Sequence, residues 1–84
     1  MRDEVLLKPY VTEKTMDLLE RHNSIVFIVR KDATKPDIKR AFEKMFGVVV
    51  EGVRTKNTKH GKQAIIKLAK GYSAEEVGMR IGLF

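Results

Sequence analysis

The sequence contains no cysteine, no tryptophan and only two prolines. Without cysteine no disulfide framework can form, which is typical of proteins in a reducing compartment such as the cytoplasm. The longest apolar stretches, 25–29 and 48–50, are far shorter than the ~20 residues that cross a bilayer, and the N-terminus has no signal-like apolar segment. The length of 84 residues fits one domain, 1–84, with a thin core. We expect neither membrane insertion nor secretion.

The patterns of common catalytic and metal sites are also missing. His22 and His60 are far apart in the sequence, and no cysteine is available to complete a metal site. The sequence shows no serine-protease-like triad, no glycine-rich phosphate loop and no paired carboxylates beside an apolar neighbour. An acylphosphatase-like enzyme would need a phosphate-binding loop with an arginine after the first strand, where this chain has Lys8, Pro9 and Tyr10. We predict no enzyme activity, no catalytic residue, no metal and no cofactor.

Positive charge is abundant and unevenly placed. Lysine and arginine number 17 against 11 acidic residues, which gives a net charge of +6. The segment 52–74 holds cations and no acidic residue, namely Arg54, Lys56, Lys59, Lys62, Lys67 and Lys70. Surfaces charged only for solubility usually mix both signs. The segment therefore favours a polyanionic partner such as a nucleic acid.

Apolar periodicity predicts the element order β, α, β, α, β, β, α. Strands are expected at 5–7, 24–29, 48–58 and 62–68, with either a bulge or a close backbone approach at Gly52 and a turn over 57–61. Strand 24–29 is apolar on both faces, as in a central strand. Helices are expected to begin after the caps Thr12, Thr34 and Ser73 and to end near Asn23, Gly47 and Gly82.

The second helix has the clearest pattern, with Pro36 in its first turn. One stripe should face the sheet and consists of Ile38, Ala41, Phe42, Met45 and Phe46. The side chains expected to face solvent are Lys35, Lys39, Arg40, Glu43 and Lys44.

The hairpin formed by the last two strands is the candidate nucleic-acid site. Cations spaced along it can follow successive phosphates, and we expect Lys56, Lys59 and Lys62 to be exposed. Asn57, Thr58 and His60 add hydrogen-bonding groups. The sheet lacks the basic-glycine-aromatic motif with which RNA-recognition motifs stack bases, so recognition of shape and backbone is favoured over base reading.

Three stretches together resemble the ribosomal protein L23 family of the large subunit. They are "LKPYVTEKT" (7–15), "DATKPDIKRAFEKMFGVVVEGVRT" (32–55) and "KQAIIKLAKGYSAEEV" (62–77). The family commonly has two basic residues before the alanine of the third stretch, whereas here Lys62 is followed by Gln63. The resemblance implies an α+β fold with a four-stranded, mainly antiparallel sheet in the order 1-2-4-3, packed with helices.

The resemblance also implies a function. The family is a structural constituent of the large ribosomal subunit that binds large-subunit rRNA near the polypeptide tunnel exit, beside ribosomal protein L29, and helps to form a docking surface for factors that meet the nascent polypeptide. The short hairpin turn and the tail "GYSAEEVGMRIGLF" look archaeal. In that lineage the implied clients are the signal recognition particle and the protein-conducting channel. Such a short turn suits anchoring in rRNA better than lining the tunnel.

The charge pattern and the family resemblance together predict a factor-docking residue and a set of rRNA-binding residues. Glu13 in "TEK" matches the family's factor-docking glutamate, although it equally suits the positive end of a helix dipole. The expected rRNA-binding residues are Lys8, Tyr10, Lys14, Lys35, Lys39, Arg54, Lys56, Asn57, Thr58, Lys59, His60 and Lys62. A stand-alone nucleic-acid-binding or chromatin protein is the main alternative.

Overall fold

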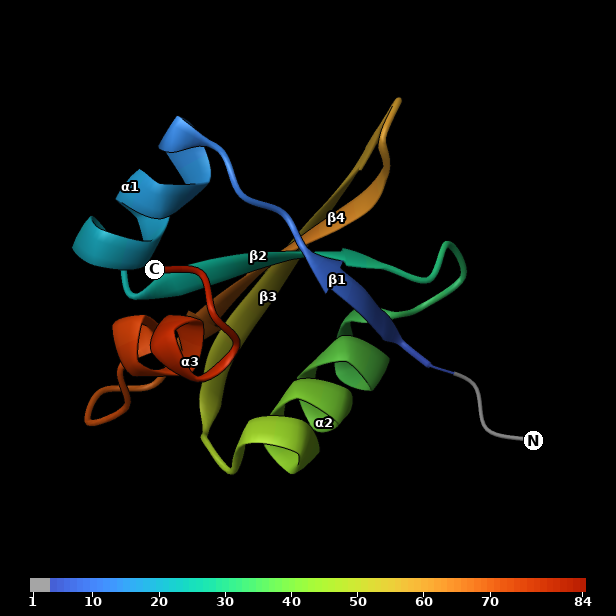
Figure 1. The fold of residues 1–84 in the computed structure, drawn as a ribbon. Helices are drawn as coiled ribbons and strands as arrows, with labels where there is room; N and C mark the ends of the chain where they lie inside the picture. The colour runs from blue at the N-terminus through green and yellow to red at the C-terminus, as the bar shows by residue number, and fades with distance from the viewer. Residues whose placement is uncertain (1–3) are drawn as a thin grey trace.

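The computed structural model describes residues 4–84, which form an antiparallel sheet packed with helices (Figure 1). The elements are β1 (Leu6–Pro9), α1 (Glu13–Arg21), β2 (Ser24–Val29), α2 (Lys35–Phe46), β3 (Val50–Thr58), β4 (Gly61–Leu68) and α3 (Ala74–Arg80). The sheet has four strands in the order β1-β2-β4-β3, and every neighbouring pair is antiparallel. The α+β class, the element order and the strand order are therefore confirmed.

The capping residues predicted from the sequence fix the first residues of α1 and α2 and the end of α2. The Thr12 hydroxyl accepts a hydrogen bond from the Thr15 N–H at 3.1 Å, and the Thr34 hydroxyl accepts one from the Asp37 N–H at 3.2 Å. In turn, the side chains of Thr15 and Asp37 accept hydrogen bonds from the backbone N–H groups of Thr12 and Thr34, so both helices begin with a capping box. Gly47, with φ 67°, ends α2 in the left-handed conformation that glycine adopts without strain.

The core lies on one face of the sheet, between β2, β4 and the helices. Phe27 of β2 meets Phe42 of α2 edge to face, with ring centroids 5.8 Å apart. Leu19 of α1 and Val77 of α3 complete the same cluster. All residues of β2 are buried, which confirms the prediction of a central strand covered on both sides. The far end of the β3–β4 hairpin projects away from α2 and α3 (Figure 1).

Two side chains of α2 differ from the prediction. Glu43 does not simply face solvent, because its Oε2 accepts a hydrogen bond from the backbone N–H of buried Val50 at 2.8 Å. Met45 is 59% exposed and is not part of the core. Met45 instead lines a groove between β1 and α2. Neither effect can be read from helical periodicity alone.

The ends of β1 and α1 differ by about two residues from those predicted from the sequence. β1 extends to Pro9, which sits on an edge strand, where a missing N–H is tolerated. α1 ends at Arg21, and Asn23 adopts φ 51°. The Asn23 side chain accepts a hydrogen bond from the Ala74 N–H and donates one to the Tyr72 carbonyl, both at 2.8 Å, so it fixes the start of α3.

The hairpin itself has the expected bulge but a tighter turn. The β3–β4 register shifts between Val50 and Gly52, which confirms the bulge at Gly52. Pairing continues to Thr58 opposite Gly61, so the turn comprises only Lys59 and His60 rather than 57–61. The hairpin is therefore paired to its end.

Candidate nucleic-acid interface

Strand register divides the hairpin side chains between two faces. Val53 pairs with Ile66, and both contribute to the core face. The next pairs, Arg54 with Ile65 and Lys56 with Gln63, therefore point to the opposite face. Strand alternation thus separates the cations of β3 from the core.

A groove of about 660 Å³ lies between that opposite face and α1. We call it the α1 groove; its lining residues are Tyr10, Thr12, Lys14, Thr15, Leu18, Val26, Arg54, Thr55, Lys56, Gln63 and Ile65. Of the predicted RNA-binding residues, it brings together Tyr10, Lys14, Arg54 and Lys56. These come from the β1–α1 connection, α1 and β3, so only the tertiary fold joins them.

The cations of the α1 groove are available for an external anion. Within the described residues, neither Lys14 nor Arg54 nor Lys56 forms an ion pair or a side-chain hydrogen bond, and all three are exposed. Neutralising a phosphate with these side chains therefore requires no ion pair or hydrogen bond among the described residues to break. The arrangement suits a polyanion, because several cations can engage it at once and release its counterions.

Two arginines near the start of α2, in contrast, are paired with neighbouring carboxylates. The Nε of Arg30 lies 2.6 Å from the Oδ1 of Asp32, and the Nη2 of Arg40 lies 2.9 Å from the Oδ1 of Asp37. The hydrogen bond from Arg30 lowers the pKa of Asp32, and the backbone N–H of Thr34 lowers the pKa of Asp37. Arg30 and Arg40 are therefore less available to an external anion than the cations of the α1 groove.

The hairpin turn lies against the β1–α1 connection. The ring of His60 is 6.2 Å from that of Tyr10, centroid to centroid, at an interplanar angle of 32°. The Thr58 hydroxyl donates to the Gly61 carbonyl at 2.8 Å and accepts from the His60 N–H at 3.2 Å. His60 is thus placed at one end of the groove face, while the Thr58 hydroxyl is committed to holding the turn.

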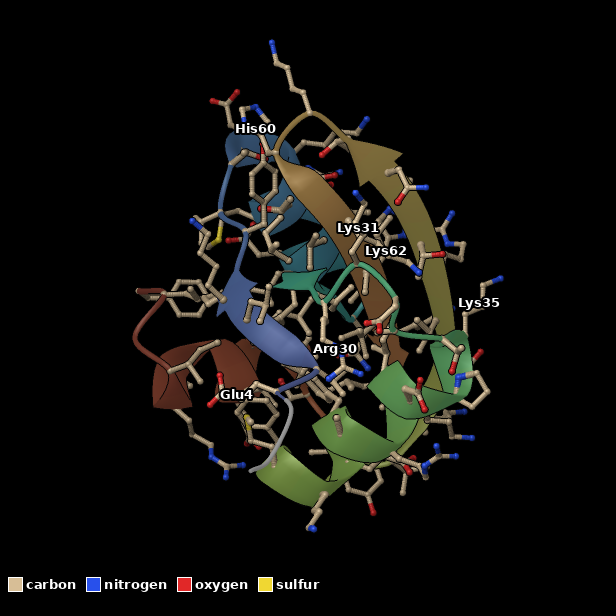
Figure 2. All side chains as sticks on the ribbon, turned by 90° about the vertical axis from the view of Figure 1, so that its right-hand side faces the viewer. Glu4, Arg30, Lys31, Lys35, His60 and Lys62 are labelled. Atoms are coloured by element: carbon tan, nitrogen blue, oxygen red, sulfur yellow. The ribbon has the colours of Figure 1, made fainter. Side chains whose placement is uncertain are left out.

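Lys62 lies elsewhere, and the prediction that its side chain is exposed was wrong. Its register partner is Asn57, on the face that points toward α2. Its Nζ donates a 2.6 Å hydrogen bond to the Ala33 carbonyl in the β2–α2 loop, in a partly buried position. Figure 2 shows Lys62 beside that loop, apart from His60 at the hairpin end. The alternation of β4 places Lys62 inward, and the loop carbonyl supplies the partner that sequence cannot reveal.

The remaining predicted residues do not line the α1 groove. Lys8 pairs with Ile28 in the register, which places it on the groove face of β1. Lys35 and Lys39 are exposed on α2, and Lys59 is exposed in the turn. The predicted docking residue Glu13 is exposed at the first position of α1.

Two features of the surface were missed at the sequence level. Gln63 is 6% exposed yet lines the α1 groove, a placement that the alternation of "KQAIIKL" could have indicated. A second groove of about 750 Å³ lies between β1 and α2, where Leu7 is 52% exposed beside Met45. It is mainly apolar and stands apart from the cation-lined groove.

Among residues 4–84, no group of three metal-ligating side chains comes together, and no helix is long and apolar enough to cross a membrane.

Comparison with known proteins shows the family to which the chain belongs. The family profile described as "Ribosomal protein L23" matches residues 4–76. The chain is 48% identical over its full length to "Large ribosomal subunit protein uL23" of Thermoplasma acidophilum, covering 100% of both chains. It is 47% identical to proteins of the same name from Methanothermobacter thermautotrophicus and Methanobrevibacter smithii, in each case over 95% of this chain and 94% of the relative. These relatives are archaeal, as the short turn and the tail suggest.

The family consists of non-enzymatic structural proteins, which confirms the prediction of no enzyme activity. With the profile match spanning most of its length, the chain belongs to the ribosomal protein L23 family.

Proposed function

We propose that this protein is a structural component of the large ribosomal subunit and that it binds large-subunit rRNA through the α1 groove. The observation that carries the proposal is the gathering of Lys14, Arg54 and Lys56 around one groove, where none of them has an ion-pair or hydrogen-bond partner among residues 4–84. Phosphate contacts of this kind position a protein on RNA. The relatives named for the large subunit, similar over the full length, support the assignment to rRNA rather than to another polyanion.

The hairpin acts as an anchor in this proposal. Its turn is limited to Lys59 and His60, and its strands are paired without interruption from Gly52 to the turn. The exposed turn lysine and the cations of β3 would contact RNA on neighbouring surfaces of one rigid arm. A hairpin this short reaches little beyond the domain, so we assign it anchoring in rRNA near the tunnel exit rather than lining of the tunnel.

Protein neighbours form the second part of the proposal. The resemblance implies contact with ribosomal protein L29, with the signal recognition particle, with the protein-conducting channel and with the nascent polypeptide. Glu13 supports a docking role by its exposure at the start of α1. Substitution Glu13→Lys should weaken co-sedimentation of signal recognition particle with ribosomes that carry the variant. Unchanged co-sedimentation would exclude Glu13 from docking.

The experiment that tests rRNA binding compares two charge-matched variants. The groove variant carries Lys14→Met, Arg54→Met and Lys56→Met; the control carries Arg21→Met, Lys44→Met and Lys70→Met, which remove equal charge from exposed positions outside the groove. We expect the groove variant to lose affinity for large-subunit rRNA and to show a shallower salt dependence, and the control to change much less. Equal losses in both variants would contradict the groove assignment. Equal affinity of the wild type for random duplex DNA would favour a general nucleic-acid-binding protein.

Co-sedimentation tests the assembly directly. Expressed in an archaeal host, the tagged protein should migrate with large subunits in a sucrose gradient at high salt. Recovery only in the soluble fraction at the top of the gradient would contradict a ribosomal role.

A further inference from the structure

The α1 groove has features that contacts with phosphates alone do not require. Leu18, Val26 and Ile65 give it an apolar floor beneath the exposed cations. A phosphate track needs only exposed cations and hydrogen-bond donors, whereas an apolar floor suits the face of an aromatic ring. We propose that the groove holds one unstacked nucleobase of single-stranded RNA, with its phosphates held at the rim; this inference rests on the proposed rRNA binding.

Gln63 gives the groove a means to hydrogen-bond the edge of a base. Its side chain is among the few polar side chains buried in residues 4–84, with an exposed fraction of 6%. The Nε2 donates to the Thr58 hydroxyl over a long 3.4 Å, and the Oε1 has no hydrogen-bond donor within the described residues. A side-chain amide offers two donor hydrogens and an acceptor oxygen, so most of its capacity remains free. Since Gln63 lines the groove, this free capacity is directed to whatever occupies it.

Tyr10 adds an aromatic surface at the same place. Its backbone N–H donates to the Val26 carbonyl at 2.9 Å, which holds the residue beside β2, and its ring lies near that of His60. Unpaired RNA bases are commonly recognised by stacking on such rings together with hydrogen bonds to their edges. The volume of about 660 Å³ lies within the usual range of small-ligand sites.

In this arrangement, the rim and the floor of the groove contribute differently to the affinity for RNA. Lys14, Arg54 and Lys56 contribute salt-dependent affinity that does not depend on the base. Gln63 and the apolar floor contribute affinity that disappears when the base is removed and that is insensitive to salt. The two contributions can be measured separately, which distinguishes the base site from general rRNA binding.

The test uses two RNA probes that differ only in their bases. One is hexauridylate, whose bases stack weakly on one another, and the other is an abasic hexamer with the same sugar-phosphate backbone. We expect hexauridylate to bind about tenfold more tightly. In NMR titrations of the ¹³C-methyl and ¹⁵N-labelled protein, hexauridylate should shift the methyl signals of Val26 and Ile65 and the side-chain amide signal of Gln63. The abasic hexamer should shift only signals near the rim.

Neutral substitutions provide the second measurement. Gln63→Leu keeps the size and the charge count, and Ile65→Trp fills the groove; each should reduce the preference for hexauridylate over the abasic hexamer while the salt dependence stays unchanged. Lys59→Met is the control, because this exposed turn residue lies outside the groove and should lower affinity for both probes equally. Should Ile65→Trp fail to fold, Gln63→Leu and the wild-type titrations decide alone.

Two failures have different meanings. Equal binding of both hexamers, with the methyl signals of the floor unmoved, overturns the base site while leaving rRNA binding intact. No binding of either hexamer together with no binding of large-subunit rRNA overturns the base site and the proposed function together.

Discussion

Lys56 and Lys62 look equivalent in the sequence, yet the structure predicts different effects on substitution. Both are basic residues of one hairpin, six positions apart. Lys56 is exposed, lines the α1 groove and has no side-chain partner in the part of the chain that the structure describes, whereas Lys62 donates a 2.6 Å hydrogen bond to the Ala33 carbonyl. Methionine is the suitable substitution at both positions, since it keeps an unbranched chain and removes the charge.

We expect Lys56→Met to act on RNA binding and to leave the fold intact. One lost phosphate contact lowers the slope of log affinity against log salt by about 0.7 for a single strand. Over a range from about 50 to about 200 mM salt, the contact accounts for about a 2.6-fold change in affinity, which the variant should no longer show. Fluorescence anisotropy with a large-subunit rRNA fragment, repeated at several salt concentrations, measures both quantities.

We expect Lys62→Met to act on stability instead. A hydrogen bond from a charged donor contributes about 1.5 kcal/mol or more, and its loss leaves the Ala33 carbonyl short of a partner. For a domain of this size, that loss corresponds to a fall in Tm of about 6–12 °C. Calorimetry should show this fall for Lys62→Met and almost none for Lys56→Met. A Tm at the wild-type value for Lys62→Met, together with a salt slope reduced as for Lys56→Met, would refute the distinction.

Three further predictions concern the fold that supports the site. Glu43→Ala should lower the free energy of unfolding by about 1–3 kcal/mol in urea titrations, because the buried Val50 N–H loses its acceptor, and Glu43→Gln should recover part of the loss; no difference between Glu43→Ala and the wild type would contradict this role. The backbone N–H of Thr34 lowers the pKa of Asp37, so the wild type should be more stable than Asp37→Asn at neutral pH, and the gap should close as the pH falls from 3.8 downward; a gap that persists at the lowest pH would refute the linkage. Gly47→Ala should cost about 1 kcal/mol through its φ of 67° alone, since no atom lies within 4 Å of the added Cβ, and Gly47→Asn should cost less, as a comparison of urea midpoints will show.

The features predicted correctly from the sequence are those governed by neighbours along the chain. Thr12 and Thr34 cap helices by bonds to residues three positions ahead, and Gly47 ends a helix by its own conformation. The bulge at Gly52 and the central position of β2 also follow from local pattern. The strand order did not come from periodicity, because alternation does not specify which strands pair; it came from the family resemblance.

The features missed by the sequence depend on contacts between distant segments. Lys62 finds its partner 29 residues away, and the acceptor role of Glu43 arises only where the chain returns after Gly47. The candidate site has the same character, because its lining comes from the β1–α1 connection, α1 and the sheet. Charge counting identified the cations Arg54 and Lys56 but could not show that they share a groove with Gln63.

The hairpin combines a buried base with a polar end, and this has a consequence for binding. Near its base, Val50 and Leu68 are paired and almost fully buried in the core, which fixes the direction of both strands. Near its end, the Thr58 hydroxyl closes the turn and Lys62 ties the second strand to the β2–α2 loop. The backbone that carries the groove cations is therefore held in register before RNA arrives. Binding then needs to order only side chains rather than the loop, and preorganisation of this kind increases affinity by reducing the entropy lost on association. Loosening the hairpin at Lys62 should consequently weaken RNA binding indirectly, with the salt slope unchanged, which is the signature that separates a supporting residue from a phosphate contact.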